Sequence, residues 1–291
     1  RQAIIDCGGE FYFNHQLVDM QTNNNSLTGI TIQHVENKSL IAFKTSQLIL
    51  ATGHSARDIY QLLVEKDIET EVKPFALGVR VEHPQELIDS IQYHCNIGAV
   101  AETRKYLPAS SYSLVEQIKD RGVYSFCMCP GGIIAPCATA PGEVVTNGWS
   151  PSKRNNPYAN SGIVVAVGEQ DFIPYQKFKS LAGMRYQAAV EHNAWLHGGQ
   201  TQVAPAQRLN DFIQKKLSND LPSCSYQPGV KSANLNEVLP HEVALRLRLA
   251  FENFGKKMKG YTSNEAIILG VESRTSTPVR IPRNNDDLCH I

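Results

Sequence analysis

The chain has 291 residues, of which 42% are hydrophobic, and its 28 basic and 28 acidic side chains give a formal net charge of zero. A chain of this length can bury large cores and form two domains. The balanced charge argues against nonspecific binding to nucleic acid or to an anionic membrane, and no apolar segment reaches the length of a membrane span. The seven cysteines lack the spacing of a disulfide framework, so a reducing cytoplasm is the expected location.

The first part of the chain predicts a small antiparallel meander. Strands are expected over residues 10–20, 27–35 and 39–43, because turn-forming Asn-rich and charged segments separate them. A further apolar run, Leu48–Ala51, stops at Thr52-Gly53, and an unbroken run of this kind is typical of a parallel strand covered on both faces. An ordinary buried strand followed by a turn is the alternative.

The order of these elements resembles a segment of two-dinucleotide-binding-type flavoproteins, in which a strand ending in Ala-Thr-Gly lies near the flavin dinucleotide. No Gly-x-Gly sequence occurs in the chain, so the phosphate-binding fingerprint of a dinucleotide fold is missing. We therefore interpret the chain as an interior piece of a longer enzyme whose pyrophosphate-binding turn precedes Arg1. On this interpretation the chain alone holds FAD weakly or not at all.

The middle of the chain predicts an α+β (mixed α/β) domain. A helix near residues 58–65 leads to Lys73-Pro74, the expected crossover into this second domain. Strands are expected at 75–82, 122–129, 143–147 and 162–167, with helices at 83–93 and 172–197. This order indicates an α+β sandwich and is compatible with a ferredoxin-like plait.

Two further helices are predicted from apolar stripes, over residues 205–217 and 240–258, and the segment 218–239 between them is expected to be a surface loop. In the second helix, Arg246 and Arg248 are expected to face solvent. A strand over 266–271 precedes an arginine-rich segment. The predicted domains are residues 1–73, part of an FAD-binding domain, residues 74–265, a substrate domain, and residues 266–291, which return to the first.

The most unusual local sequence is Cys127-Met-Cys-Pro-Gly-Gly132. At a strand end Cys127 and Cys129 are expected to point to the same face, and Pro130, Gly131 and Gly132 let the backbone approach a ligand. Cys129 is a candidate redox thiol against a flavin ring or substrate. The alternative is a strand of small buried residues that ends in a glycine turn. Paired Cys-x-x-Cys ligands are lacking, so no metal site is predicted.

A second constellation, Glu272–Arg283, contains three arginines, four hydroxyl side chains and two prolines. Arg274, Thr275 and Arg280 are candidate ligands for an anionic substrate, because guanidinium groups bind carboxylate or phosphate through paired N–H bonds. The alternative is an extended surface segment with solvated arginines. His83 is a candidate acid–base group, with a capping or hydrogen-bonding role as the alternative; His54 carries the same two readings.

Five motifs together resemble a bacterial family of FAD-dependent dehydrogenases or oxidoreductases, whose members are named for the cofactor. The motifs stand in family order in the segments 50–58, 73–85, 127–132, 145–148 and 273–281. The resemblance implies that Thr52, Gly53, Ser55 and Arg57 lie near the flavin, and that the Pro130–Gly132 loop and the segment from Arg274 to Arg280 face the reaction cavity. Family members also carry a Gly-x-Gly-x-x-Gly unit before the region of Arg1 and a glycine-rich flavin segment after that of Ile291.

The resulting hypothesis is the substrate-recognising portion of an FAD-dependent oxidoreductase that moves hydride between flavin and an unknown small-molecule substrate, for which an anionic group is considered. The alternatives are a flavoprotein-like module that binds a macromolecule and a catalytically idle scaffold. Neither the substrate, the electron acceptor nor the oligomeric state follows from the sequence.

Overall fold

The computed structural model describes residues 1–286 and 289–290 and divides the chain into two compact units. Unit 1 consists of residues 1–70 and the described part of 281–291, and Unit 2 consists of Glu71–Arg280. Helices and strands occur in similar amounts, so the predicted α+β class is confirmed. Among the described residues no helix is both long and apolar enough to cross a membrane.

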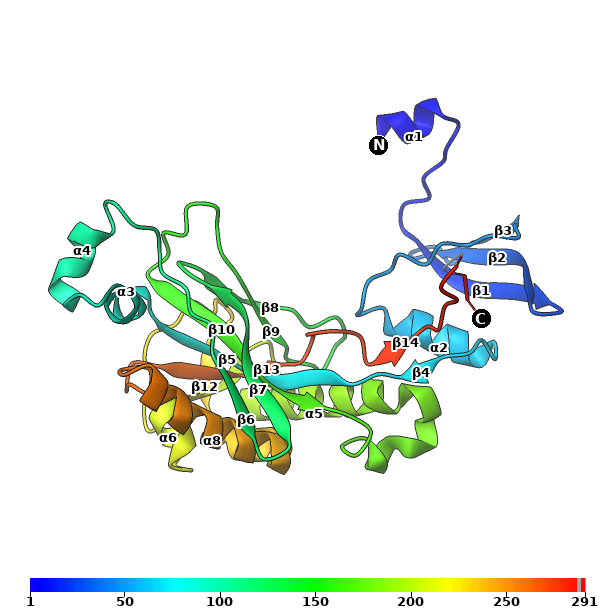
Figure 1. The fold of residues 1–291 in the computed structure, drawn as a ribbon. Coiled ribbons are helices and arrows are strands. Elements are labelled where there is room, and N and C mark those ends of the chain that lie inside the picture. The colour runs from blue at the N-terminus through cyan, green and yellow to red at the C-terminus, as the bar shows by residue number, and fades with distance from the viewer. Residues whose placement is uncertain (287–288, 291) are drawn as a thin grey trace. The chain divides into compact units, whose positions relative to one another are not determined.

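Unit 1 contains the predicted three-stranded antiparallel meander (Figure 1). Its elements are α1 (Gln2–Asp6), β1 (His15–Asn23), β2 (Ser26–His34), β3 (Leu40–Lys44) and α2 (Arg57–Glu65). Its small core comes mainly from α2, which buries Ile59, Tyr60, Leu62 and Leu63. These residues recur at helical spacing on one face of α2.

The parallel strand predicted from Leu48 to Gly53 does not form. These residues have no regular secondary structure, and Ile49 is 90% exposed. Within the described residues the segment pairs with no neighbouring strand. Because an extended segment becomes a strand only when its backbone groups join a ladder, the apolar run alone does not define one here.

Unit 2 is built on a seven-stranded sheet in the order β12-β11-β13-β5-β10-β7-β6. Its strands are β5 (Phe75–Pro84), β6 (Val115–Ile118), β7 (Arg121–Cys129), β10 (Tyr158–Val167), β11 (Ala204–Arg208), β12 (Val230–Ser232) and β13 (Ile267–Glu272). Two ribbons accompany it, β4 (Glu71–Val72) with β14 (Val279–Arg280), and β8 (Ile133–Pro136) with β9 (Thr146–Trp149). The helices are α3 (Gln85–Tyr93), η1 (Ile97–Ala99), α4 (Val100–Thr103), η2 (Ile173–Leu181), α5 (Ala182–Gly198), α6 (Leu209–Ile213), α7 (Leu235–Val238) and α8 (His241–Lys257).

The four central strands have the arrangement of a ferredoxin-like plait. β5 and β7 are both antiparallel to β10, which lies between them, so they are parallel to each other and form a split β-α-β unit. β10 and β13 flank β5 in the same way. The sequence predicts that residues 266–291 return to the first domain, whereas β13 is a central strand of Unit 2 because it pairs with both β5 and β11.

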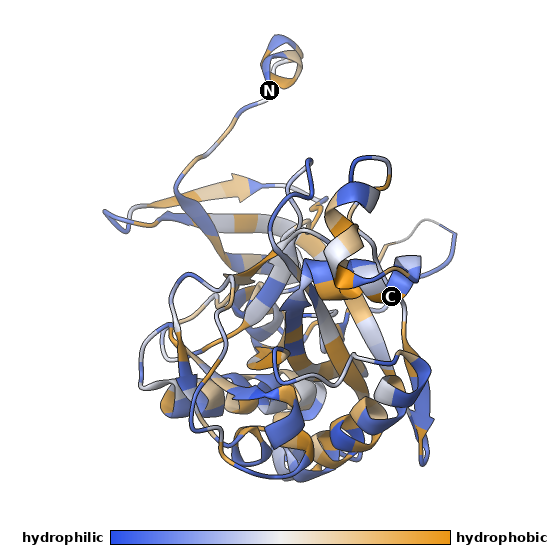
Figure 2. Cartoon of the chain, turned by 90° about the vertical axis from the view of Figure 1, so that its left-hand side faces the viewer, coloured by the Kyte–Doolittle hydropathy of each residue, from blue (hydrophilic) through white to orange (hydrophobic). Residues whose placement is uncertain are grey.

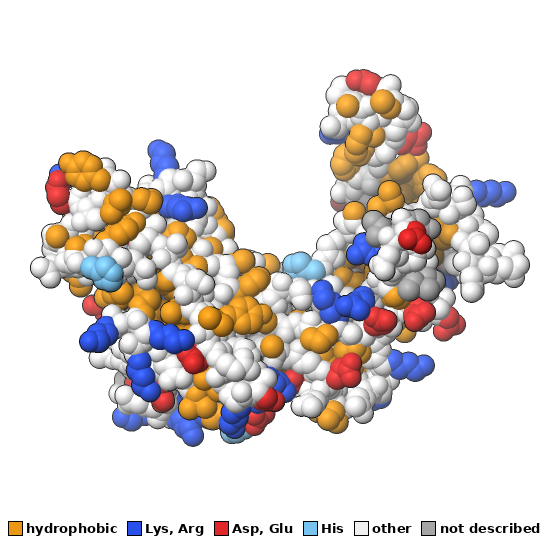
Figure 3. All heavy atoms as spheres, viewed as in Figure 1, with side chains coloured by type: hydrophobic (Ala, Val, Ile, Leu, Met, Phe, Trp, Pro, Cys, Tyr) orange, Lys and Arg blue, Asp and Glu red, His pale blue; other side chains and the backbone are white. Residues whose placement is uncertain are grey.

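Different elements pack on the two faces of the sheet (Figure 1). Helices α5 and α8 cover one face: α8 packs against β5, β6, β7 and β10, and α5 packs against β11, β12 and β13 and, through Tyr186, against Phe75 of β5. The β8–β9 ribbon packs against β5, β7, β10 and β13 on the other face. Figure 2 shows hydrophobic, orange stretches both in the strands of the sheet and along the helices, where they alternate with hydrophilic ones. On the outside, basic and acidic side chains are interspersed over the face of Unit 2 seen in Figure 3.

Two predicted helices are corrected by the structure. The segment 172–197 is divided into η2 and α5, because Lys179 adopts φ 51° and ψ −127°, which no helix allows. Residues 205–208 of the segment 205–217 belong to strand β11, whose pairing with β12 and β13 outweighs the helical spacing of the apolar residues, and the helix of this segment is the short α6. The predicted loop 218–239 contains β12 and α7.

Helix α8 forms as predicted, but its arginines do not face solvent. Arg246 and Arg248 are 5% and 7% exposed. Arg246 reaches Asp120 at 2.8 Å and Glu242 at 2.5 Å, so counter-charges compensate its burial.

Candidate functional site around Arg80 and the Cys127 bulge

The polar centre of Unit 2 is Arg80, which lies on β5 beneath the β8–β9 ribbon and is 0% exposed. Its Nε donates to Glu272 Oε2 at 2.8 Å. Its Nη1 donates to the Cys127 carbonyl and to Asn160 Oδ1, both at 3.0 Å. We call Arg80, Glu272, Asn160 and this carbonyl the Arg80 cluster. It joins four strands, β5, β7, β10 and β13, through one guanidinium.

Two glycines make room for the guanidinium. A Cβ on Gly148 of β9 would lie 2.3 Å from Arg80 Nη1, and a Cβ on Gly162 of β10 would lie 3.4 Å from Nη2. Gly162 lies opposite Arg80 in the β5–β10 register, and Gly148 pairs with Ile134 in the β8–β9 ribbon, so both glycines are placed by strand pairing rather than by a flexible loop. The cluster is therefore closely packed as well as hydrogen-bonded.

Beside the cluster, β7 contains a β-bulge. Asn160 pairs with Cys129, but Gly162 pairs with Phe126, so β7 has one residue more than β10 between these pairs. Cys127 has a φ of 45° and an exposed side chain, whereas Cys129 is 8% exposed. The prediction that the two thiols share a face is therefore wrong, because the extra residue breaks the alternation of the strand.

The buried Cys129 thiol donates to the Cys127 carbonyl at 3.2 Å. Burial raises the pKa of Cys129, although the Arg80 guanidinium nearby acts in the opposite direction. A thiol that is buried and protonated is a poor nucleophile. A redox role for Cys129 stays a prediction that this environment does not favour.

The Pro130–Gly132 loop follows directly and is buried. The Gly131 amide donates to Gln85 Oε1 at 2.6 Å and the Gly132 amide to the Tyr158 carbonyl at 3.0 Å. Gly131 has a φ of 52°, and a Cβ there would lie 1.9 Å from the Arg154 carbonyl oxygen. These glycines allow close packing against the protein itself, and their amides already have partners.

Glu82 lies two residues from Arg80 on the same face of β5 and is 1% exposed. It accepts a hydrogen bond from the Ser225 amide at 2.7 Å and another from the Ser225 hydroxyl. Burial raises the pKa of Glu82 to about 7. Ser225 Oγ in turn accepts from the Ile134 amide at 2.8 Å, so Glu82 anchors strand β8 through Ser225.

The segment after β13, predicted to bind an anionic substrate, is held by protein groups. Arg274 makes a two-pronged pair with Glu191 of α5, with Nε–Oε1 at 2.7 Å and Nη2–Oε2 at 2.9 Å. Glu143 lies 3.3 Å from Nη2, and Ser273 Oγ donates to Glu191 at 2.6 Å. Two carboxylates therefore already compensate the charge of Arg274.

The other two predicted anion ligands lie further along this segment. Thr275 Oγ1 accepts from the Ala76 amide at 3.0 Å and donates to the Ala76 carbonyl at 2.9 Å. Arg280 is exposed and forms an ion pair with Glu71 at 3.4 Å. The structure thus places one predicted arginine inside Unit 2 and the other on its surface, and only Arg280 is accessible to a solute.

His83 lies on the helix-covered face of the sheet and is 0% exposed. Its Nε2 contacts the Tyr261 carbonyl at 2.8 Å, and its ring packs 4.6 Å from that of Tyr261. Burial lowers the pKa of His83 to about 4. This environment suits a neutral core histidine better than an acid–base group.

In Unit 1, Thr52 and Gly53 are exposed, while Ser55 and Arg57 are half-buried. Gly53 has a φ of 78°, and no atom lies within 4 Å of the Cβ position. Thr52, Gly53 and Ser55 precede α2, and Arg57 is its first residue. By themselves they do not form a cradle for a dinucleotide, and their contact with FAD stays a prediction.

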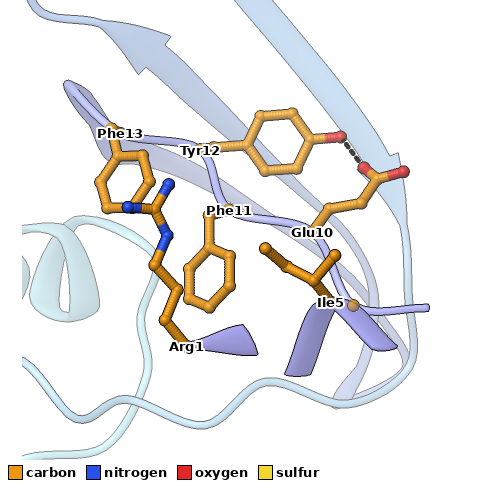
Figure 4. Close-up of a pocket in the computed structure, with 7 residues that line it drawn as sticks. Arg1, Ile5, Glu10, Phe11, Tyr12 and Phe13 are labelled. Atoms are coloured by element: carbon orange, nitrogen blue, oxygen red, sulfur yellow. Dashed lines mark hydrogen bonds between the residues drawn. The ribbon is translucent and has the colours of Figure 1, made fainter. Parts of the chain in front are cut away.

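Unit 1 also has a surface pocket of about 410 Å³ between α1 and the segment before β1 (Figure 4). Arg1 stacks over Phe13 at 4.8 Å and over Phe11 at 5.7 Å, and the two phenylalanine rings stack 5.7 Å apart. Within the described residues, no group of three or more His, Cys, Asp or Glu side chains is placed to hold a metal ion.

Sequence reasoning missed Arg80, Asn160 and Glu191. The signal for Arg80 was present, because Arg80 and Glu82 alternate with valines in the strand. Such alternation is normally that of a strand with one solvated face, whereas here the β8–β9 ribbon covers that face. No local pattern distinguishes Asn160 or Glu191 from surface polar residues.

Comparison with known proteins identifies two relationships. A family described as "FAD-dependent protein, C-terminal domain-like" matches residues 74–275. A Clostridium beijerinckii (strain ATCC 51743 / NCIMB 8052) protein named "Uncharacterized protein" is 39% identical over 288 residues, which are 98% of this chain and 51% of the relative. The chain therefore spans about half the length of this curated relative.

Proposed function

Because the chain belongs to the FAD-dependent protein, C-terminal domain-like family, we propose that it is the substrate-recognising portion of an FAD-dependent oxidoreductase. In such an enzyme the flavin ring exchanges hydride with the substrate, and the protein orients both. The observation that carries the proposal is the family match, which covers almost all of Unit 2. A cytoplasmic location accords with the cysteine content and belongs to the same proposal.

The geometry of Unit 2 supports a role as a rigid scaffold that orients the bound substrate. Its charged interior groups are paired with one another, and a plait with both faces covered gives a rigid base. Rigid elements hold binding groups more accurately than loops do. Of the two candidate arginines, Arg274 is buried and Arg280 is exposed, so we assign contact with an anionic substrate group to Arg280 rather than Arg274.

The first test is the visible absorption spectrum of the full-length protein, followed by anaerobic reduction and reoxidation. Flavin bands that bleach on reduction and return with an added electron acceptor are expected. A protein that carries no flavin as purified, and takes up none when FAD is added, contradicts the proposal. Once a substrate is found, Arg280→Ala should raise its KM, whereas Lys259→Ala, a surface change in the same unit, should not.

A further inference from the structure

We propose that Arg80 is a positioning residue that keeps the β7 bulge in place and thereby decides which thiol of the Cys127–Cys129 segment reaches solvent. The inference rests on the geometry of Unit 2 and holds whether or not the proposed reaction is correct. It assigns a role to the residue that joins four strands of the sheet.

The first step concerns the carbonyl of Cys127. A bulge leaves its extra residue outside the regular ladder, so the carbonyl of that residue needs another donor. Arg80 Nη1 supplies one at 3.0 Å, and the Cys129 thiol supplies a weaker one at 3.2 Å. A charged donor makes the stronger hydrogen bond, so Arg80 is the main partner of this carbonyl.

The second step is the backbone of Cys127. Its φ of 45° lies in the left-handed region that favours glycine, so the bulge is unfavourable for a cysteine unless other contacts compensate. The competing state is a regular strand, in which residues two apart point to the same face. In that state Cys127 and Cys129 would have similar surroundings.

The third step explains why the guanidinium stays in place. Glu272 holds Nε and Asn160 holds Nη1, and Gly148 leaves room for the planar group. Removing the Nη1 branch should therefore favour the regular register. With the bulge intact, Cys127 is the thiol of this segment that a soft electrophile or redox partner can reach, because Cys129 is buried.

The test is residue-resolved alkylation of the full-length native protein with iodoacetamide, read by peptide fragmentation. In the wild type we expect Cys127 to react about 100-fold faster than Cys129, since a buried thiol reacts only after local opening. Arg80→Lys retains a charge for Glu272 but loses the forked donor. It should reduce this ratio about tenfold or more, because the Cys127 carbonyl loses its charged partner.

Arg246→Lys is the matched control, because Arg246 is also buried and paired with carboxylates, on α8. It should leave the ratio unchanged. If Arg80→Lys does not fold, the double variant Arg80→Met/Glu272→Met replaces it, since removing both charges leaves no lone buried ion. A folded Arg80 variant with the wild-type ratio overturns the proposal, as does a wild type in which Cys127 reacts as slowly as Cys129.

Discussion

Gly148 shows how closely single residues are fitted around the Arg80 cluster. A Cβ there would lie 2.3 Å from Arg80 Nη1 and 2.2 Å from Asn160 Oδ1, and neither group can move without losing its partners. We expect Gly148→Ala to lower the free energy of unfolding by about 1–3 kcal/mol, as overpacking does in other cores. Urea unfolding of the wild type and the variant measures this difference in the free energy of unfolding. Gly98→Ala, where no atom lies within 4 Å, is the control, and equal effects of the two changes would contradict the prediction.

Glu82 gives a pH dependence whose sign follows from its pKa. Burial raises that pKa from 4.5 to about 7, so the folded protein holds a proton that the unfolded chain releases. The stability that this proton provides is complete below pH 4.5 and is lost as the pH rises through 7. Glu82→Gln should remove this decline, and melting temperatures of both proteins across this range provide the measurement. Parallel pH profiles of the two proteins would show that Glu82 does not titrate in this way.

His83 is adjacent in sequence and acts in the opposite direction. Burial lowers its pKa from 6.5 to about 4, so its contribution to stability is present above pH 6.5 and is lost as the pH falls through 4. The two contributions change in opposite directions over overlapping pH ranges, so in the wild type they should largely offset each other between pH 4.5 and 6.5. His83→Gln, which carries no titrating ring, should therefore expose the fall in stability that Glu82 causes as the pH rises through 7, and a wild-type pH profile in this variant would contradict the assignment.

At the scale of elements, the Glu191–Arg274 pair fastens helix α5 to the end of β13. Both side chains are buried, and removing Glu191 takes away the two-pronged partner of Arg274 and leaves it only the longer contact with Glu143 at 3.3 Å. Glu191→Ala should therefore cost about 3–5 kcal/mol of unfolding free energy. Arg280→Ala, which breaks only the exposed pair with Glu71, should cost about 0–1 kcal/mol. Denaturant unfolding of the two variants compares them directly, and similar losses would refute the distinction between the two arginines.

The elements predicted well are those whose signal is local. Strand β5 and helix α8 have apolar residues at their own characteristic spacing, so neighbours in sequence are enough to identify them. The sequence predicts a helix at strand β11, because the strand character of these residues comes from pairing with β13, which is far away in the chain. The strand predicted at Leu48–Ala51 is wrong for the converse reason, since this run has the composition of a strand but pairs with no other strand in the described residues.

The candidate site could be predicted only in part, because most of its contacts join residues that are far apart in the sequence. The Cys127–Gly132 sequence correctly marks an unusual strand end, and Glu272 was included in the second constellation. The bulge itself depends on the register between β7 and β10, which no local pattern encodes. Because the partner of each buried charge comes from a distant strand or helix, Arg274 could not be distinguished from a solvated arginine by sequence.

At the scale of the whole molecule, the two units differ in what holds them together. Among the described residues of Unit 1, the buried aliphatic and aromatic side chains outside proline are Met20 and four residues of α2, whereas the large aromatic and aliphatic core belongs to Unit 2. Unit 2 is also a single continuous segment, Glu71–Arg280, while Unit 1 uses two separate segments. Burial of apolar area is the main stabilising term in folding, so most of the stability should reside in Unit 2.

A protein of residues 71–280 alone should therefore fold and unfold cooperatively, whereas residues 1–70 alone should not. The reason is that a chain segment folds independently only when it encloses its own hydrophobic core. Thermal unfolding followed by near-ultraviolet circular dichroism tests both segments. Leu247→Ala removes a fully buried side chain of α8 and should lower the stability of the 71–280 protein by about 2–5 kcal/mol, which verifies that the native core has formed. A 71–280 protein without a cooperative transition, or one insensitive to Leu247→Ala, would show that its core needs residues outside Unit 2.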